Sequence, residues 1–308
     1  ATVAKAGQDT LKILLVRISY ETNRDPDLVT LAADGDFFYE PRFPDDPGVP
    51  VDPEPHDRAF FESHLEGLRQ YYFFQSGGRL HIDARVLPEG DRDSYKLSDP
   101  ADYGPGAGQF WTLEGLERFV RDMIATADAG ASDDGVSLAD FDDDDDLTYI
   151  IFAHAGSDWQ SDINQDSPND VPTFFVTLGE PQALESTDSE TGATGLLSEC
   201  SVIPETTTQD GYKGSIAAAL YHEFGHALGL PDVYDAVSGY TACGVWDLMD
   251  SGTNLAANIG YEDPDTGEIV AEPVTGILPP SLSAWCKWFL GWVATDHVPG
   301  GEGAEVRL

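Results

Sequence analysis

The chain has 308 residues, of which 41% are hydrophobic and 11% aromatic, and it can therefore bury the core of one large domain or of two modest ones. It carries 56 Asp and Glu against 16 Lys and Arg, a formal net charge of -40 that excludes nucleic acid and anionic membranes as partners by repulsion. No stretch reaches the roughly 18 apolar residues of a membrane-spanning helix.

Two explanations of this acidity stay open. One is a halophilic protein in strong brine, where salt screens the repulsion among carboxylates. The other is a secreted protein whose carboxylates bind calcium. The three cysteines, Cys200, Cys243 and Cys286, cannot all pair within one chain. A Cys200–Cys243 disulfide and three small buried thiols are both compatible with the sequence.

Hydrophobic periodicity predicts a mixture of strands and helices along the chain. Strands are expected at 11–20, 79–87, 148–154 and 172–178, and helices at 57–75, 113–128, 214–229 and 281–290. Irregular or exposed segments are expected at 24–56, 129–146 and 184–196, with a linker at 256–280. Because strands and helices are interspersed, the pattern favours an α/β or α+β catalytic domain over a bundle or a sandwich.

A metal-binding pattern lies in the third predicted helix, where residues 221–235 read YHEFGHALGLPDVYD. His222 and His226 are four residues apart, so both imidazoles lie on one face of a helix and can reach one Zn2+ ion. Glu223 is adjacent and can accept a proton from a metal-activated water without binding the metal itself. The pattern therefore predicts the zinc centre of a hydrolase.

The third zinc ligand is expected from the chain that follows this helix. Gly229 can adopt the left-handed conformation that ends a helix, and Pro231 then favours an extended segment. Asp232 is the first side chain able to face the metal after this reversal, ahead of Asp235. The extended motif HExxHxxGxxD resembles that of the metzincins, and Met249 stands where their Met-turn would be.

Beyond the motif, the chain resembles the immune inhibitor A family of secreted metallopeptidases. The segments that carry the resemblance are HEFGHALGLPDVYD (222–235), WDLMDSG (246–252), LSAWCKWFLGWV (282–293), RQYYFFQSGGRLHI (69–82) and FDDDDDLTYIIFAHAG (141–156). The resemblance implies one metzincin-like catalytic domain, with a twisted, mainly parallel sheet and the active-site helix in an upper part (1–229). The lower part (230–308) would hold the Met-turn and a smaller helical subdomain.

The resemblance also implies extracellular proteolysis and calcium sites, with the signal and any propeptide absent from this chain. The acidic run at 140–146 offers carboxylates at alternate positions: Asp140, Asp142, Asp144 and Asp146. It lacks the glycine and the glutamate that an EF-hand needs, so a Ca2+ site and a solvated acidic loop both stay open.

The expected function is hydrolysis of peptide bonds in polypeptide substrates by a zinc endopeptidase, with Glu223 as general base. Tyr234 and Tyr240 are candidates for a donor to the developing oxyanion, although aromatic residues beside a helix commonly only pack. Two alternatives remain, a zinc hydrolase acting on non-protein amides and a non-catalytic surface module that keeps the fold. The sequence gives no oligomeric state.

Overall fold

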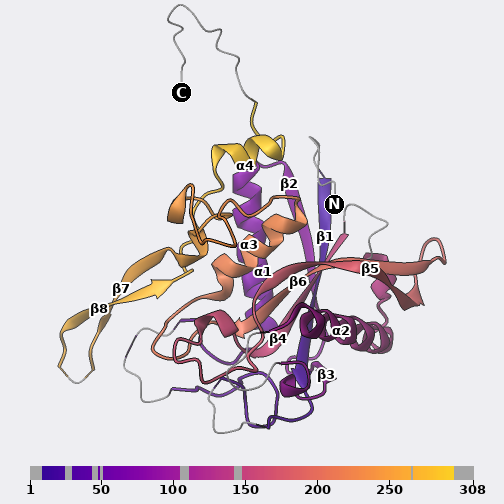
Figure 1. Cartoon of the computed structure of the whole chain (residues 1–308), viewed down its shortest axis with the longest axis horizontal. Coiled ribbons are helices and arrows are strands. Elements are labelled where there is room, and N and C mark those ends of the chain that lie inside the picture. The colour runs from indigo at the N-terminus through magenta and orange to yellow at the C-terminus, as the bar shows by residue number, and fades with distance from the viewer. Residues whose placement is uncertain are drawn as a thin grey trace, which may run out of the picture.

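The computed structural model describes residues 9–24, 30–43, 48, 51–104, 111–141, 148–264 and 266–294. Its central element is a six-stranded sheet in the order β2-β1-β4-β6-β5, with β3 also paired to β1 (Figure 1). The strands are β1 (Asp9–Tyr20), β2 (Leu80–Leu87), β3 (Tyr95–Leu97), β4 (Thr148–Ser157), β5 (Phe174–Thr187) and β6 (Thr194–Thr206). All of these pairs are parallel except β5 with β6. The expected α/β architecture with a mainly parallel sheet is confirmed.

The centre of this sheet is buried on both faces. Almost every side chain of β4 is buried, including those that alternate from one face to the other. The adjacent strand β1 is buried from Ile13 to Tyr20. Near-continuous burial of this kind is typical of parallel strands that have helices or loops packed on both sides.

The described part of the chain contains four α-helices. Their bounds are α1 (Arg58–Gln75), α2 (Leu113–Asp133), α3 (Ile216–Ala227) and α4 (Ala284–Phe289). Helix α3 contacts both β6 and α1, and α1 packs against β2, whereas α2 packs against β5 and β3 (Figure 1). The four predicted helices are thus present, although α2 continues to Asp133, where a loop was expected, because Ala131 still faces the core.

Each of these helices begins at a polar side chain that accepts a hydrogen bond from the first turn. The capping residues are Asp57 for α1, Thr112 for α2, Ser215 for α3 and Ser283 for α4. Such caps satisfy backbone N–H groups that have no partner within the helix. Among the described helices, none is long and apolar enough to cross a membrane.

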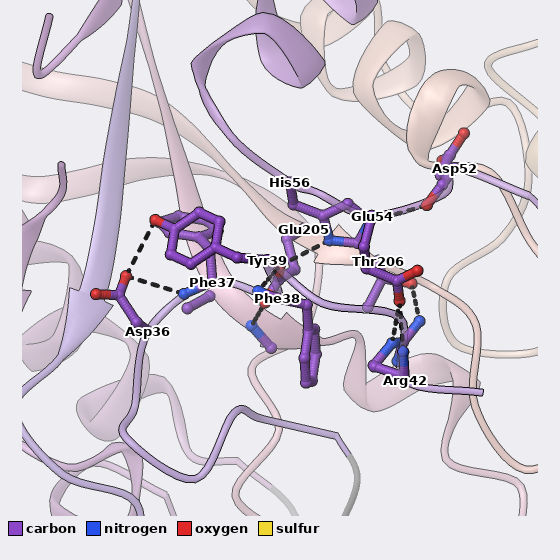
Figure 2. Close-up of polar contacts among 12 residues, drawn as sticks. Asp36, Phe37, Phe38, Tyr39, Arg42, Asp52, Glu54, His56, Glu205 and Thr206 are labelled. Carbon is purple, nitrogen blue, oxygen red and sulfur yellow. Dashed lines mark hydrogen bonds and ion pairs between the residues drawn. The ribbon is translucent and has the colours of Figure 1, made fainter. Parts of the chain in front are cut away.

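Residues 30–43 and 51–57, which we call the bracing segment, have no regular secondary structure but are tied to the middle of the fold (Figure 2). The His56 imidazole contacts the buried Glu205 carboxylate of β6 at 2.7 Å, and Arg42 contacts Glu54 at 3.0 Å. The Asp52 carboxylate accepts a hydrogen bond of 2.8 Å from the backbone N–H of Ile216 at the start of α3. The segment therefore anchors the N-terminus of that helix.

The region 256–280 is not the linker that its composition suggested. It contains the antiparallel hairpin of β7 (Ala256–Glu262) and β8 (Ile269–Thr275). The two strands alternate between exposed and half-buried positions over most of their length, so neither forms the continuous apolar run by which a buried strand is recognised. Part of the segment 184–196 is likewise strand, because β5 and β6 extend through it with irregular register.

None of the three cysteines, all of which the structure describes, is part of a disulfide. Cys200 and Cys286 are buried, and Cys243 is exposed, so no Cys200–Cys243 disulfide is formed in this structure. The Cys286 thiol lies 3.6 Å from an oxygen of the buried Asp247 carboxylate. Two of the three therefore behave as small buried side chains, which was one of the two alternatives.

Candidate metal centre

Helix α3 carries the two histidines one turn apart on the same face of the helix. The helix ends as expected at Gly229, whose φ of +84° is left-handed. The N–H of Gly229 donates to the His226 carbonyl at 2.8 Å, and the N–H of Leu230 donates to the Gly225 carbonyl at 3.1 Å. This turn reverses the chain and brings Asp232 back toward the histidines.

The structure brings His222, His226 and Asp232 together. The Nε2 atom of His222 lies 3.1 Å from Oδ1 of Asp232, and that of His226 lies 3.4 Å from the same oxygen. The candidate ligand atoms of the three residues all lie within 4.8 Å of one another. Two imidazole nitrogens and one carboxylate oxygen are the donor set that Zn2+ takes in catalytic sites.

The hydrogen bonds of the two imidazoles show that this group fits a cation. Nδ1 of His222 contacts the Leu248 carbonyl and Nδ1 of His226 contacts the Leu230 carbonyl, both at 2.8 Å. A carbonyl oxygen only accepts, so each Nδ1 carries the proton and a neutral ring presents a lone pair at Nε2. Two lone pairs then face a carboxylate oxygen, an arrangement that is stabilised by a bound cation or by a proton taken up at Nε2.

The electrostatics of the site agree with this interpretation. Burial raises the pKa of Asp232, but the hydrogen bonds with His222 and His226 outweigh it and hold that pKa well below its usual range. Burial lowers the pKa of His222, but the hydrogen bond with Asp232 and the charge of Glu223 outweigh it and raise that pKa. Both shifts mean that the carboxylates favour a positive charge at this point.

Glu223 is buried, with 8% of its surface exposed, and it lines the same cavity as His222. Burial raises the pKa of its carboxyl, while the charges of His222 and His226 lower it, and the net shift is upward. A raised pKa makes a carboxylate a stronger base. Glu223 is outside the group of three ligand atoms and so remains available for proton transfer.

Met249 lies beneath the helix that carries the histidines. Its side chain is fully buried against α3, so close to Gly225 that a Cβ added there would lie 2.4 Å from the Met249 sulfur. The Met249 carbonyl accepts a hydrogen bond of 2.8 Å from the N–H of Val233, next to Asp232. The buried Asp247 carboxylate accepts from the Met249 N–H at 3.1 Å. This loop therefore supports both the helix and the segment of the third candidate ligand.

A cavity of ≈ 420 Å³ opens beside His222 and Glu223. Its polar lining includes side chains from four segments outside the HExxH motif: Asp158, Gln160 and Ser161; Thr173; Thr207, Tyr212 and Ser215; Asp250, Ser251, Thr253 and Asn254. The first three segments match no motif and meet the site only through the fold, whereas Asp250 and Ser251 lie in the WDLMDSG segment (246–252) that the sequence singled out.

The two candidate tyrosines differ in position. Tyr234 lines the cavity, and its ring centre lies 6.4 Å from that of His222. Burial and the charge of Asp232 raise the Tyr234 pKa to about 12, so its hydroxyl stays protonated and can donate a hydrogen bond. Tyr240 is 76% exposed and does not line this cavity. Tyr234 is therefore the better placed of the two.

Only residues 140 and 141 of the acidic run at 140–146 are described. Asp140 accepts hydrogen bonds from the Ser189 N–H at 2.7 Å and from its hydroxyl at 2.9 Å, whereas Asp142, Asp144 and Asp146 lie outside the described residues. Elsewhere, carboxylates of three Asp residues that sequence analysis did not select approach within 4.8 Å of one another, namely Asp162, Asp166 and Asp210. The first two are four residues apart in a loop, and the third comes from the loop after β6.

These features define a class of protein, since an HExxH helix with a converging aspartate beside a cavity is the arrangement of metal-dependent peptidases. Comparison with known proteins leads to a narrower group. The model of the family "Immune inhibitor A peptidase M6, catalytic domain" matches residues 177–268, a range that includes α3, the three candidate ligands and Met249. The resemblance to the immune inhibitor A family is thereby confirmed.

Two similar curated proteins agree with this match. Immune inhibitor A of Bacillus thuringiensis subsp. alesti is 29% identical over 217 residues, which are 62% of this chain and 29% of that protein. The pre-pro-metalloprotease PrtV of Vibrio cholerae serotype O1 (strain M66-2) is 26% identical over 246 residues, which are 72% of this chain and 23% of that protein. The aligned regions thus span less than a third of each relative. Together the comparisons support a metalloendopeptidase.

Proposed function

We propose that the chain is a zinc endopeptidase of the metzincin type, with His222, His226 and Asp232 as metal ligands and Glu223 as general base. The observation that carries the proposal is the convergence of the two Nε2 atoms on one Asp232 oxygen beside a cavity that Glu223 also lines. When bound, Zn2+ would activate a water molecule and polarise the scissile carbonyl.

The residues of the chain supply the other parts of the reaction. Glu223 accepts a proton from the attacking water and passes it to the leaving amine, acting first as base and then as acid. The Tyr234 hydroxyl donates to the oxygen of the scissile carbonyl as negative charge develops there. The Leu248 and Leu230 carbonyls hold the two imidazoles in the tautomer that presents Nε2 to the metal.

The substrate is an extended polypeptide that pairs with strand β5. This strand lies at one end of the sheet order, so one of its edges has no partner strand within the sheet. The ring centre of its residue Phe175 lies 5.5 Å from that of His226, so the strand passes close to the candidate metal centre, which supports this proposal. A peptide added to such an edge is bound by main-chain hydrogen bonds, independently of its sequence.

Three further parts of the proposal rest on the resemblance. The residues 1–229 and 230–308 would form the upper and lower parts of one catalytic domain, with the substrate between them. The enzyme would act outside the cell, as a similar pre-pro-metalloprotease suggests. Calcium would bind at acidic loops. A non-catalytic surface module is disfavoured, because such a module has no use for the buried Glu223 carboxylate beside the metal ligands.

Digestion of unfolded casein by the purified chain tests the proposal. We expect cleavage that stops when a chelator removes the metal and returns when Zn2+ is added back. If casein stayed intact while a cell-wall glycopeptide was hydrolysed in the same buffer, the chain would be a zinc hydrolase of non-protein amides. If neither substrate were cleaved by the zinc-loaded protein, the catalytic proposal would be wrong.

A further inference from the structure

The cavity beside the candidate metal centre has a lining that selects among substrate side chains. It lies next to His222 and Glu223, so a side chain near the scissile bond would enter it. We propose that this cavity accepts one substrate side chain and prefers a positively charged one, Lys or Arg. The inference rests on the proposed peptidase function and adds the substrate class to it.

The lining of the cavity is negatively charged. Apart from Glu223, the cavity is lined by the carboxylates of Asp158 and Asp250, which are 6% and 1% exposed. Among the described residues that line it there is no Lys or Arg. A divalent metal is formally balanced by Asp232 and Glu223. Burial raises the pKa of Asp158 to about 6, so above this pH the two other carboxylates leave the cavity with a net negative charge. Buried charges are poorly screened by salt, so their field acts across the cavity.

The carboxylates of Asp158 and Asp250 are held in fixed positions by hydrogen bonds from nearby N–H and hydroxyl groups. Asp158 accepts from the N–H groups of Gln160 and Thr173 at 3.1 and 3.2 Å, and from the Thr173 hydroxyl at 3.1 Å. Asp250 accepts from the N–H groups of Ala242 and Gly244 at 2.9 and 3.0 Å. Because these hydrogen bonds fix the two carboxylates before a substrate binds, the carboxylates need not reorganise when it does. The negative charge is therefore preorganised.

The rest of the cavity lining is rich in oxygen atoms that can accept hydrogen bonds. Hydroxyl and amide oxygens that can accept hydrogen bonds are supplied by six residues: Ser161, Thr207, Tyr212, Ser251, Thr253 and Asn254. An ammonium or guanidinium group can donate to these oxygens while the two carboxylates stabilise its charge. An apolar substrate side chain would displace water from these oxygens without replacing the lost hydrogen bonds. An acidic side chain would be repelled by the two carboxylates.

The cavity is also large enough. Its volume of ≈ 420 Å³ lies in the usual range of about 300–1,000 Å³ for pockets that bind small ligands. It can therefore hold one long side chain together with water that bridges its charged end to the lining. Ala219, three residues before His222 on the same face of α3, lines this space with only a methyl group and so leaves it open.

The test uses matched peptides that differ at one position near the scissile bond. Fluorogenic peptides with Lys, Arg, norleucine or Glu at each position in turn are digested by the zinc-loaded chain. Norleucine resembles Lys without the ammonium group, so the ratio of the two kcat/KM values isolates the charge. We expect kcat/KM for Lys to exceed that for norleucine by about tenfold or more at one position.

Three variants connect the preference to this cavity. Ala219→Lys places a positive charge in it and should abolish the Lys preference and raise the relative rate with Glu. Ala219→Gln adds nearly the same volume without charge and should keep the preference. Asp158→Asn keeps an oxygen acceptor for the two N–H groups but removes a charge, and should reduce the preference. Each ratio is measured on one sample, so a partly unfolded variant does not distort it.

The outcomes separate this inference from the proposed function. Cleavage of the peptides with no Lys or Arg preference at any position would overturn the inference and leave the peptidase function intact. A preference that Ala219→Lys and Asp158→Asn both left unchanged would also overturn it, because another surface would then be the cause. If no peptide were cleaved by the zinc-loaded chain, the proposed function itself would fail, and the inference with it.

Discussion

Replacing Asp232 by Ala should weaken zinc binding far more than replacing Asp235, although the two lie three residues apart. Oδ1 of Asp232 is 3.1 and 3.4 Å from the two imidazole nitrogens, so its loss leaves two protein ligands and removes the negative charge between them. Asp235 instead accepts hydrogen bonds from the N–H groups of Val237 and Ser238 at 2.9 and 3.3 Å within its own exposed turn.

The size of the effect follows from these contacts. Mutation of a residue that only orients a metal ligand typically costs 10- to 100-fold in affinity, and removal of a ligand should reach or exceed the upper end of that range. We therefore expect Asp232→Ala to raise the zinc Kd by about 100-fold or more, which is about 2.7 kcal/mol. Asp235→Ala should change it by less than about threefold, as for surface substitutions away from a site.

The assay is competition for zinc between the protein and a chromophoric chelator, which reads the metal directly and not the activity. Circular dichroism of the metal-free variants checks that each has folded. A Kd for Asp232→Ala within a few-fold of the unmodified chain would refute the reasoning. So would an equal loss in both variants, since it would place the effect in the loop and not in the Asp232 carboxylate.

Three more outcomes are expected. Glu223→Gln should lower kcat by about 10²- to 10⁴-fold while zinc binding, measured by the same competition, stays unchanged; near-normal turnover would contradict the role of this residue as a base. If the charge of -40 reflects brine, the melting temperature should rise steadily from low to molar NaCl, whereas a rise with millimolar CaCl2 alone would favour calcium sites instead. His56→Ala should lower the free energy of unfolding by about 3 kcal/mol, because it leaves the buried Glu205 carboxylate without its imidazole partner, while His81→Ala on the exposed face of β2 should change it by less than about 0.5 kcal/mol. Burial lowers the His56 pKa, but the hydrogen bond with Glu205 outweighs it, so the pKa is raised in the folded chain. The His56–Glu205 pair therefore contributes its full stability below the unfolded His pKa of about 6.5, and this contribution is lost as pH rises through the folded pKa. The difference in unfolding free energy between the unmodified chain and His56→Ala, measured by urea denaturation, should shrink over the same rise in pH.

Much of the fold could be predicted from local patterns. The four helices follow from apolar residues at helical spacing, and the buried strands β1 and β4 from short continuous apolar runs. The hairpin of β7 and β8 was missed because its side chains are mostly exposed or half-buried, so its stability comes from pairing and not from burial of an apolar face. Strand β6 was missed for a related reason, since Ser, Thr and Glu interrupt its apolar residues.

The candidate site, like the fold, could be predicted only in part from the sequence. The helix geometry of His222 and His226 and the turn at Gly229 are consequences of sequence neighbours, so spacing alone predicted the group that the structure brings together. The partners that hold the group come from elsewhere in the chain. The Asp158 carboxylate and the brace at Asp52 are distant in sequence and bear no motif, and only the fold brings them to α3. The Leu248 carbonyl comes from the WDLMDSG segment, but its contact with His222 is also visible only in the structure.

The bracing segment has a consequence for the order in which the chain folds. Helix α3 is 12 residues long, and isolated helices of that length are marginal in water. Its first turn is held by the local cap Ser215 and by Asp52, which lies 164 positions before Ile216 in the chain. Contacts between residues so far apart in sequence form slowly, because the entropy of closing a large loop is lost before the contact contributes any favourable free energy. The histidines thus reach their final positions only after the two distant parts of the chain have met, which makes metal capture a late event in folding.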